Sequence, residues 1–327
     1  MTSLLPVAFD TDTARAQIEA ADQAMFGNPL PFLRRTPLWK LPGAALGVDC
    51  HEIWLKLEHL QVSGSFKARG MLWRLMAYAQ APTSPAGAVI ASGGNAGIAC
   101  AQAAAHLGMP CEVFVPEVCP QAKRDRLAAL GAKVTVQGAR YPQALEACLA
   151  RQRETGAVLV HAYDQPEVVI GAGTLALEIE AQGGRMPDVT LVSVGGGGLV
   201  AGLAAGYGLR GRVIALEPEL APTLVQARAA GQPLDVEVGG VAVDSLGARR
   251  IGAIAWEVTQ RLVVDALTVS EDAIRQAQRQ MWGDLRLAVE PAAALPLAAL
   301  HSGVWRPRPD STVCLIVCGA NVDPATL

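Results

Sequence analysis

Short apolar runs alternate with helix-like segments along most of this chain. The runs at 88–91, 111–115, 133–136, 190–194 and 212–217 are each followed by a stretch with helical spacing. Parallel strands produce this alternation, because each crossover between them needs about a dozen residues or more, usually as a helix. The pattern therefore predicts an α/β fold with two open, twisted, mostly parallel sheets flanked by helices.

The alternation divides into two units of unequal size, with a break near the strand and loop at 157–166. We expect a smaller domain over 59–162. The larger predicted domain joins 1–58 to 163–327.

Composition narrows the class of protein. A chain that is 51% hydrophobic and 17% charged can bury sizeable cores, and a net charge of -3 argues against nucleic acid as a partner. The seven cysteines are scattered without a Cys-x-x-Cys pair, which is typical of reduced thiols in the cytoplasm. The N-terminal residues predict neither a signal peptide nor a membrane span. We expect a cytoplasmic protein with no membrane partner.

Lys67 is one of only five lysines and lies in Ser-Gly-Ser-Phe-Lys-Ala-Arg-Gly, residues 63–70. Small neighbours let the backbone come close to a ligand. A crowded ammonium loses solvation, so its pKa falls and the neutral amine becomes a nucleophile or a base. Amines of this kind form Schiff bases with aldehydes.

Four consecutive glycines, 195–198, separate an apolar strand from a helix. Backbone N–H groups at such a helix N-terminus bind phosphate. The same segment also matches a dinucleotide fingerprint at 196–201, and Glu217 ends the next strand about where a ribose-binding acid is expected. Taken alone, it would equally favour an NAD-dependent dehydrogenase.

Two further turns follow strands. Ser92-Gly93-Gly94-Asn95-Ala96-Gly97 places a hydroxyl and an amide near a helix start, where they could hold a carboxylate or a ring hydroxyl. Cys318-Gly319-Ala320-Asn321 follows the last strand. By itself, the first turn has a plain helix cap as its alternative, and the second is better explained as a buried cysteine that ends a strand.

Together with Lys67, the three glycine turns resemble, in this order, the fold type II pyridoxal-phosphate enzymes, and in particular the serine/threonine dehydratase (ammonia-lyase) group. The resemblance covers nearly the whole chain and extends to the segments 35–38, 56–61, 217–219 and 289–294. It implies the architecture of the tryptophan synthase β subunit and pyridoxal 5'-phosphate as cofactor. It also implies a homodimer and a small amino-acid substrate.

The resemblance implies a role for each matched residue. Lys67 would carry the cofactor as a Schiff base and take the substrate Cα proton, while Phe66 and Ser245 lie at the two faces of the ring. The other implied cofactor contacts are Asn95 to the 3'-oxygen, Cys318 to the pyridine nitrogen, and Gly195, Gly196, Gly197, Gly198 and Leu199 to the phosphate. The implied substrate-carboxylate loop is Ser92, Gly93, Asn95 and Ala96.

The implied reaction is β-elimination of water from L-serine or L-threonine, giving a 2-oxo acid and ammonia. A thiol such as Cys318 is a weak donor and cannot keep the pyridine nitrogen protonated, which suits quick elimination. Serine racemases of this group carry a serine where this chain has Gly93, so Gly93 favours a lyase. A 3-hydroxyaspartate dehydratase stays open, because 238–245 departs from the usual threonine dehydratase pattern. The regulated threonine dehydratases have an additional C-terminal unit, and a chain ending at 327 favours a catabolic enzyme.

Glu217, Ala221 and Thr223 match a cation site of the same group. Racemases tend to have a third carboxylate there for a divalent ion, whereas Thr223 offers a neutral oxygen. One carboxylate with carbonyls, including those of Gly195, Leu246 and Ala248, fits a monovalent ion such as K⁺ better. The alternative is that Glu217 is an exposed charge at a strand end.

Overall fold

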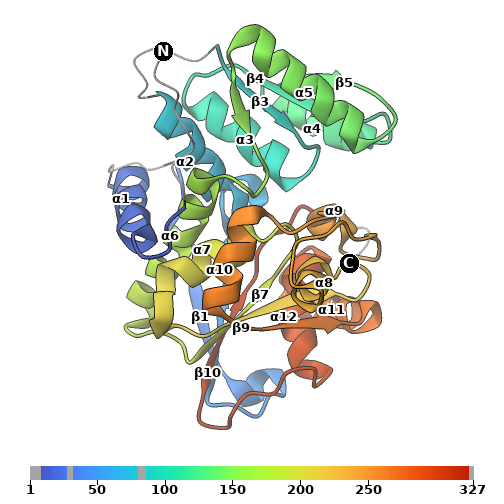
Figure 1. Cartoon of the computed structure of the whole chain (residues 1–327). Coiled ribbons are helices and arrows are strands. Elements are labelled where there is room, and N and C mark those ends of the chain that lie inside the picture. Colours follow the sequence, from blue (N-terminus) through green and yellow to red (C-terminus); the bar gives the residue numbers. More distant parts are fainter. Residues whose placement is uncertain (1–8, 28–31, 80–85, 324–327) are drawn as a thin grey trace.

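The computed structural model describes residues 9–27, 32–79 and 86–323, which form two sheets with helices around them (Figure 1). The larger sheet has the strand order β1-β2-β10-β7-β8-β9, and the smaller has the order β5-β4-β3-β6. Every neighbouring pair is parallel except β1 and β2. The predicted fold class is therefore confirmed.

The strands of the larger sheet are β1 (Leu38–Pro42), β2 (Glu52–Lys56), β7 (Val189–Ser193), β8 (Val213–Pro218), β9 (Val263–Val269) and β10 (Thr312–Ile316). Those of the smaller sheet are β3 (Ala88–Ala91), β4 (Cys111–Val115), β5 (Lys133–Val136) and β6 (Val158–Val160). All five residues of β7 are buried, so helices cover both faces of the larger sheet at its centre.

The helices of the first half are α1 (Ala14–Phe26), α2 (Lys67–Ala79), α3 (Asn95–His106), α4 (Gln121–Ala129), α5 (Tyr141–Thr155) and α6 (Pro166–Gly183). Those of the second half are α7 (Gly198–Tyr207), α8 (Thr223–Ala230), α9 (Val243–Leu246), α10 (Ala253–Leu262), α11 (Glu271–Leu285) and α12 (Pro291–His301). Helix α7 is buried on all sides, whereas the buried residues of α11 recur at helical spacing along one side of the helix.

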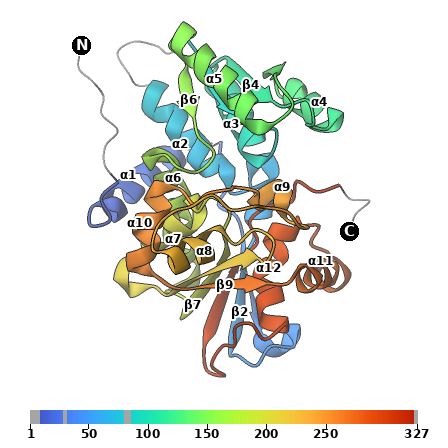
Figure 2. The same cartoon turned by 45° about the vertical axis from the view of Figure 1, so that its right-hand side comes forward.

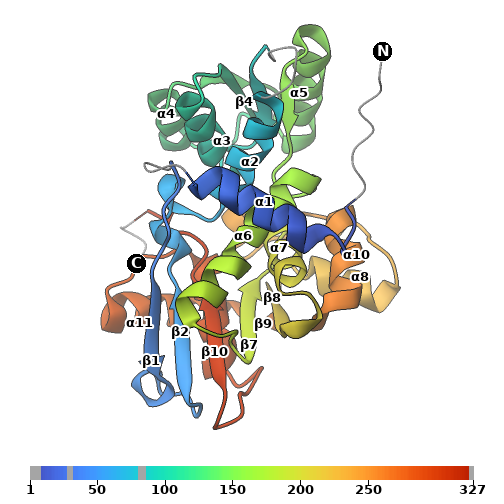
Figure 3. The same ribbon diagram turned by 90° about the vertical axis from the view of Figure 1, so that its left-hand side faces the viewer.

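Helices connect the two sheets. Figure 3 shows α1 lying across α6 and α7, and its buried residues Ala14, Ile18, Ala21 and Met25 join the same core as α2 and α3. In Figure 2, α9 lies just below α3 and α4, and an ion pair between Lys123 and Asp244 joins α4 to α9. The division into domains at 59 and 162 stays a prediction, with the whole smaller sheet lying inside that range.

Strand β9 is not among the apolar runs that the sequence predicts as strands. The strand lies at the edge of the larger sheet, where Val264 and Asp265 are exposed and the next three residues are only partly buried. An edge strand needs only one apolar face, so it lacks the continuous apolar run of β7 or β8.

In the described part of the chain, no helix is long and apolar enough to cross a membrane.

Candidate functional site

Lys67 is the first residue of α2, and the segment before it is pinned to the C-terminal turn. Phe66 N–H donates to the Cys318 carbonyl at 3.1 Å, and Ala320 N–H donates to the Gly64 carbonyl at 2.9 Å. Ser65 and Gly319 pair as an isolated antiparallel bridge. The structure thus brings together two motifs that are some 250 residues apart in the sequence.

The Lys67 amine is partly buried and donates to the Ala162 carbonyl at 2.6 Å. Burial lowers the pKa of Lys67 to about 8, although the nearby carboxylate of Glu290 opposes that shift. At neutral pH this makes the fraction of neutral amine roughly 300-fold larger than for a free lysine. Lys67 therefore has the properties of a nucleophile or a base.

The glycine loop between β7 and α7 presents backbone donors to the same cavity. Among the hydrogen bonds of the described residues, none uses the N–H groups of 195–199 as donors. Gly197 has a φ of +91°, which only glycine adopts readily, and it directly precedes the first turn of α7. Free N–H groups at a helix N-terminus form an anion site suited to a phosphate.

Close packing also requires glycine in this loop. A Cβ on Gly196 would lie about 2.3 Å from ring atoms of Tyr163, and one on Gly198 would lie 2.9 Å from the Tyr163 carbonyl. On Gly197 it would lie 2.4 Å from the Ala255 Cβ. Larger residues would push the loop away from its neighbours.

One cavity is lined by most of the predicted cofactor residues. Its lining consists of Phe66, Lys67, Asn95, Tyr163, Ser193, Gly195, Gly196, Gly197, Gly198, Leu199, Ser245, Leu246, Glu290, Ala292 and Cys318. Ser92, Gly93 and Ala96 are outside this lining and lie in the turn before α3 and at its start. The predicted substrate loop therefore touches the cavity through Asn95.

Cys318 is buried in the cavity wall. Burial, and next the charge of Glu290, raise the pKa of its thiol well above the usual value. The thiol is therefore neutral at physiological pH, as expected for a weak donor.

Sequence reasoning assigned no role to Glu290, Tyr163 or Ser193. Glu290 precedes the proline that starts α12 and is only 4% exposed, and its carboxylate accepts hydrogen bonds from Asn95 Nδ2 at 3.0 Å. An acidic residue inside Val-Glu-Pro-Ala-Ala-Ala was the available signal, because carboxylates are seldom surrounded by apolar residues without a partner.

The space beside Gly93 is occupied by a cysteine. A Cβ built on Gly93 would lie 2.8 Å from Cys119 Sγ and 3.3 Å from Val115 Cγ1. Cys119 lies in the loop before α4, so the neighbouring turn restricts which side chain position 93 can carry.

Glu217 is fully buried, so the alternative of an exposed strand-end charge is wrong. Its carboxylate accepts from the N–H groups of Leu224 and Val225, at 2.7 and 2.8 Å, and from Thr223 Oγ1 at 2.9 Å. Thr223 Oγ1 also lies 3.1 Å from the Gly195 carbonyl. Burial raises the pKa of Glu217 to about 7 against these three hydrogen bonds.

These contacts make Glu217 a cap for the N-terminus of α8 and link that helix to the glycine loop. No group of three or more His, Cys, Asp or Glu side chains with metal-binding geometry occurs within the described ranges. The K⁺ site at Glu217, Ala221 and Thr223 stays a prediction.

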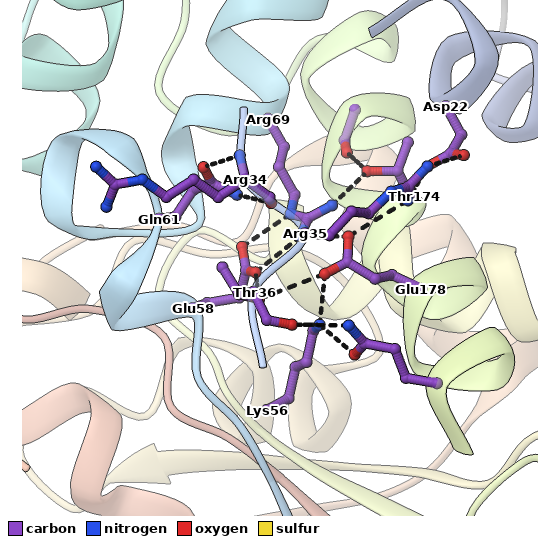
Figure 4. A network of polar contacts seen from close by, with 12 residues as sticks. Asp22, Arg34, Arg35, Thr36, Lys56, Glu58, Gln61, Arg69, Thr174 and Glu178 are labelled. Atoms are coloured by element: carbon purple, nitrogen blue, oxygen red, sulfur yellow. Dashed lines mark hydrogen bonds and ion pairs between the residues drawn. The ribbon is translucent and has the colours of Figure 1, made fainter. Parts of the chain in front are cut away.

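A buried charge network is centred on Arg69 (Figure 4). Arg69, two residues further along α2, donates to both oxygens of Glu58 at 2.8 Å and to Glu178 at 2.9 Å. Arg69 also donates to Thr174 Oγ1, and Lys56 donates to Glu178. The side chains of Lys56, Glu58, Arg69 and Glu178 are at most 1% exposed. The first turn of α2 is thereby bound to α6 and to the segment that directly follows β2.

Comparisons with known proteins agree with this geometry. The family model described as "Pyridoxal-phosphate dependent enzyme" matches residues 30–319. A serine racemase from Arabidopsis thaliana is 32% identical over 305 residues, which is 91% of each chain. An L-threonine ammonia-lyase from Geobacter sulfurreducens is 34% identical over 280 residues, covering 84% of this chain and 68% of the relative. The structure of maize serine racemase superposes with a TM-score of 0.87 at 31% identity, covering 95% and 94% of the two chains.

Proposed function

Because this chain belongs to the family of pyridoxal-phosphate dependent enzymes, we propose that it catalyses β-elimination of water from L-serine, L-threonine or both. The products are a 2-oxo acid and ammonia. The observation that carries the proposal is the shared cavity, in which the partly buried Lys67 amine and the free N–H groups of 195–199 occur together. Relatives named as threonine ammonia-lyases support the substrate class.

The residues in the cavity fit the cofactor. The free N–H groups suit its phosphate, the Lys67 amine its aldehyde, and the neutral Cys318 thiol its pyridine nitrogen. Asn95 would hold the ring 3'-oxygen, and Phe66 would pack on the ring. Bound pyridoxal phosphate supplies an electron sink for the bond that breaks at the substrate Cα.

Lys67 has two tasks in this proposal. Its neutral amine would hold the aldehyde of the bound cofactor. When free, the same amine would take the substrate Cα proton, because a pKa of about 8 is well matched to a base at neutral pH. Overall, the Cα proton and the β-hydroxyl would leave the substrate together as water, and the released enamine would take up water to give the 2-oxo acid and ammonia.

A serine racemase is the second candidate, since serine racemases are as similar to this chain as the lyases. Gly93 favours the lyase, because glycine has no acid or base with which to return a proton to the opposite face of Cα. The alternative of an NAD-dependent dehydrogenase is set aside, since the carboxylate of Glu217 caps α8 and the family is that of pyridoxal-phosphate enzymes.

The deciding experiment uses purified protein. It should be yellow, and borohydride should fix the cofactor to Lys67. We expect 2-oxo acid from L-serine or L-threonine, with 3-hydroxyaspartate in each configuration tested alongside. D-Serine as the main product from L-serine would instead establish the racemase, and a colourless protein that binds NAD would overturn the proposal as a whole.

Gly93→Ser tests the steric limit at the substrate loop. A Cβ at position 93 lies 2.8 Å from Cys119 Sγ and 3.3 Å from Val115 Cγ1, so either these side chains or the turn that carries Asn95 must move. We expect kcat/KM for elimination to fall about 10- to 100-fold, because misplacing a binding group by about 1 Å has effects of that size. Cys119→Ala added to Gly93→Ser should make room for the hydroxyl and raise D-serine formation relative to 2-oxo acid.

Chiral chromatography of serine, together with a 2-oxo acid assay, measures both reactions in all four proteins of this double-mutant cycle. Cys119→Ala alone is the control and is expected to retain elimination. Equal behaviour of Gly93→Ser with and without Cys119→Ala would show that the thiol does not limit position 93.

A further inference from the structure

Glu290 is a buried carboxylate in the wall of the cofactor cavity. Its backbone N–H donates to the Gly319 carbonyl at 3.1 Å, which fixes it beside the C-terminal turn. A Cβ on Gly319 would lie 2.4 Å from Glu290 Oε1, so only a glycine at 319 leaves room for the carboxylate. Ser245 and the N–H of Asn321 also hydrogen-bond to this group.

Glu290 determines how the Asn95 amide is oriented. Asn95 Nδ2 lies 3.0 Å from each carboxylate oxygen, while Asn95 Oδ1 accepts from Asn321 Nδ2 at 2.6 Å. A carboxylate only accepts hydrogen bonds, so the nitrogen of Asn95 must face it. One hydrogen of Nδ2 is enough for Glu290, and the other is left for an oxygen atom of a ligand in the cavity.

Glu290 also sets the charge balance around Lys67. Two ionisable groups face the carboxylate, Lys67 on α2 and Cys318 after β10, and Cys318 stays a neutral thiol. Lys67 itself is faced by Glu290, Cys318 and His161, and burial lowers the pKa of that histidine. Burial raises the pKa of Glu290, and hydrogen bonds from Asn95, Ser245 and the Asn321 N–H together with the charge of Lys67 oppose that shift. When ionised, Glu290 is the carboxylate in the cavity lining that balances a protonated Lys67.

We propose that Glu290 is a positioning residue that orients Asn95 toward the ring oxygen of the cofactor and supplies the negative charge facing Lys67. This inference rests on the proposed function, since Asn95 and Lys67 are both expected to contact pyridoxal phosphate. It gives Glu290 two separable tasks, one through hydrogen bonds and one through charge.

The test is a pH titration of the visible absorbance of the holoenzyme, which follows protonation at the nitrogen that joins Lys67 to the cofactor. In Glu290→Gln the negative charge is lost, so the protonated form is less favoured and the midpoint is expected to move about one unit toward lower pH. Glu290→Asp keeps the charge and should keep the midpoint, but its shorter side chain should weaken cofactor binding through Asn95.

Glu257→Gln changes an exposed glutamate on α10 that is outside the cavity lining, and it is the matched control, with no expected shift. A midpoint in Glu290→Gln equal to that of the wild type, with kcat/KM within twofold, overturns the inference about Glu290 alone. A wild type that gains no visible absorbance with pyridoxal phosphate overturns the proposed function as well. If Glu290→Gln does not fold, a midpoint shift in Glu290→Asp like the one expected for glutamine also overturns the charge role.

Discussion

Lys67→Ala is expected to lower kcat for 2-oxo acid formation by at least about 10³-fold, because it removes both the amine that binds the cofactor aldehyde and the base for the Cα proton. The free N–H groups of 195–199 remain, so the variant should still bind pyridoxal phosphate, but without a covalent bond. Mass spectrometry after borohydride treatment should find the cofactor attached to the wild type only.

Lys133→Ala is the matched control, because the Lys133 side chain is 63% exposed and lies outside the cavity. A high concentration of a small primary amine should restore part of the turnover of Lys67→Ala. Activity of Lys67→Ala above a tenth of the wild-type value would contradict the assignment of Lys67 as Schiff-base lysine and base.

Lys67→Ala should also change how the free energy of unfolding of the cofactor-free protein depends on pH. The pKa of Lys67 is about 8 when folded and near 10.5 when unfolded, so the unfolded chain holds the proton more tightly. The free energy of unfolding of the wild type therefore rises between about pH 8 and 10.5, and below pH 8 the buried charge destabilises the fold by about 3 kcal/mol. Lys67→Ala should lack this rise in a urea titration at each pH.

The order of strands and helices could be predicted because parallel α/β units carry their pattern locally. The apolar runs of β3, β4 and β5 coincide with the predicted strands or lie within one residue of them. The run of β9 was missed, since its exposed Val264 and Asp265 interrupt the apolar pattern at a sheet edge.

The candidate site could be predicted only where its chemistry is contained in a short stretch of sequence. The glycine loop and the lysine motif each have a chemical meaning within a few residues. The burial of Glu290 beside Lys67 and of Cys119 beside Gly93 depends on packing between distant segments, which local spacing does not contain. Glu217 shows the same limit, because its burial and its cap on α8 depend on how β8 and α8 pack.

The charge network around Arg69 also depends on packing between segments that are distant in the sequence. Moving ions such as Lys56, Glu58, Arg69 and Glu178 out of water costs several kcal/mol each, and only their mutual contacts offset that cost. A hydrophobic cluster of the same size could be at least as stable. The network instead fixes the relative positions of the segments that carry these side chains, since the planar guanidinium of an arginine pairs with carboxylates in a defined geometry.

Arg69→Met is therefore expected to lower the free energy of unfolding by about 3–5 kcal/mol, because Glu58 and Glu178 keep their buried charges but lose a shared partner. Guanidinium titration measures this effect. In the folded fraction, the first turn of α2 should loosen and shift Lys67, so kcat is expected to fall at least about tenfold. Arg69→Lys should retain more of the stability and of kcat than Arg69→Met does, but less than the wild type, since one ammonium cannot reproduce the paired contacts to Glu58.

Arg210→Met is the matched control. Arg210 pairs with Glu180 at 3.0 Å on the surface, where its side chain is 53% exposed, so the loss should stay below about 1 kcal/mol. Glu58→Gln combined with Arg69→Met removes one charge of each sign and should be less destabilised than the two single variants summed. Two outcomes would mean that Arg69 does not hold α2 in place through its charge. One is a loss of stability in the double variant equal to the sum of the two single losses, and the other is an Arg69→Met variant as stable as Arg210→Met.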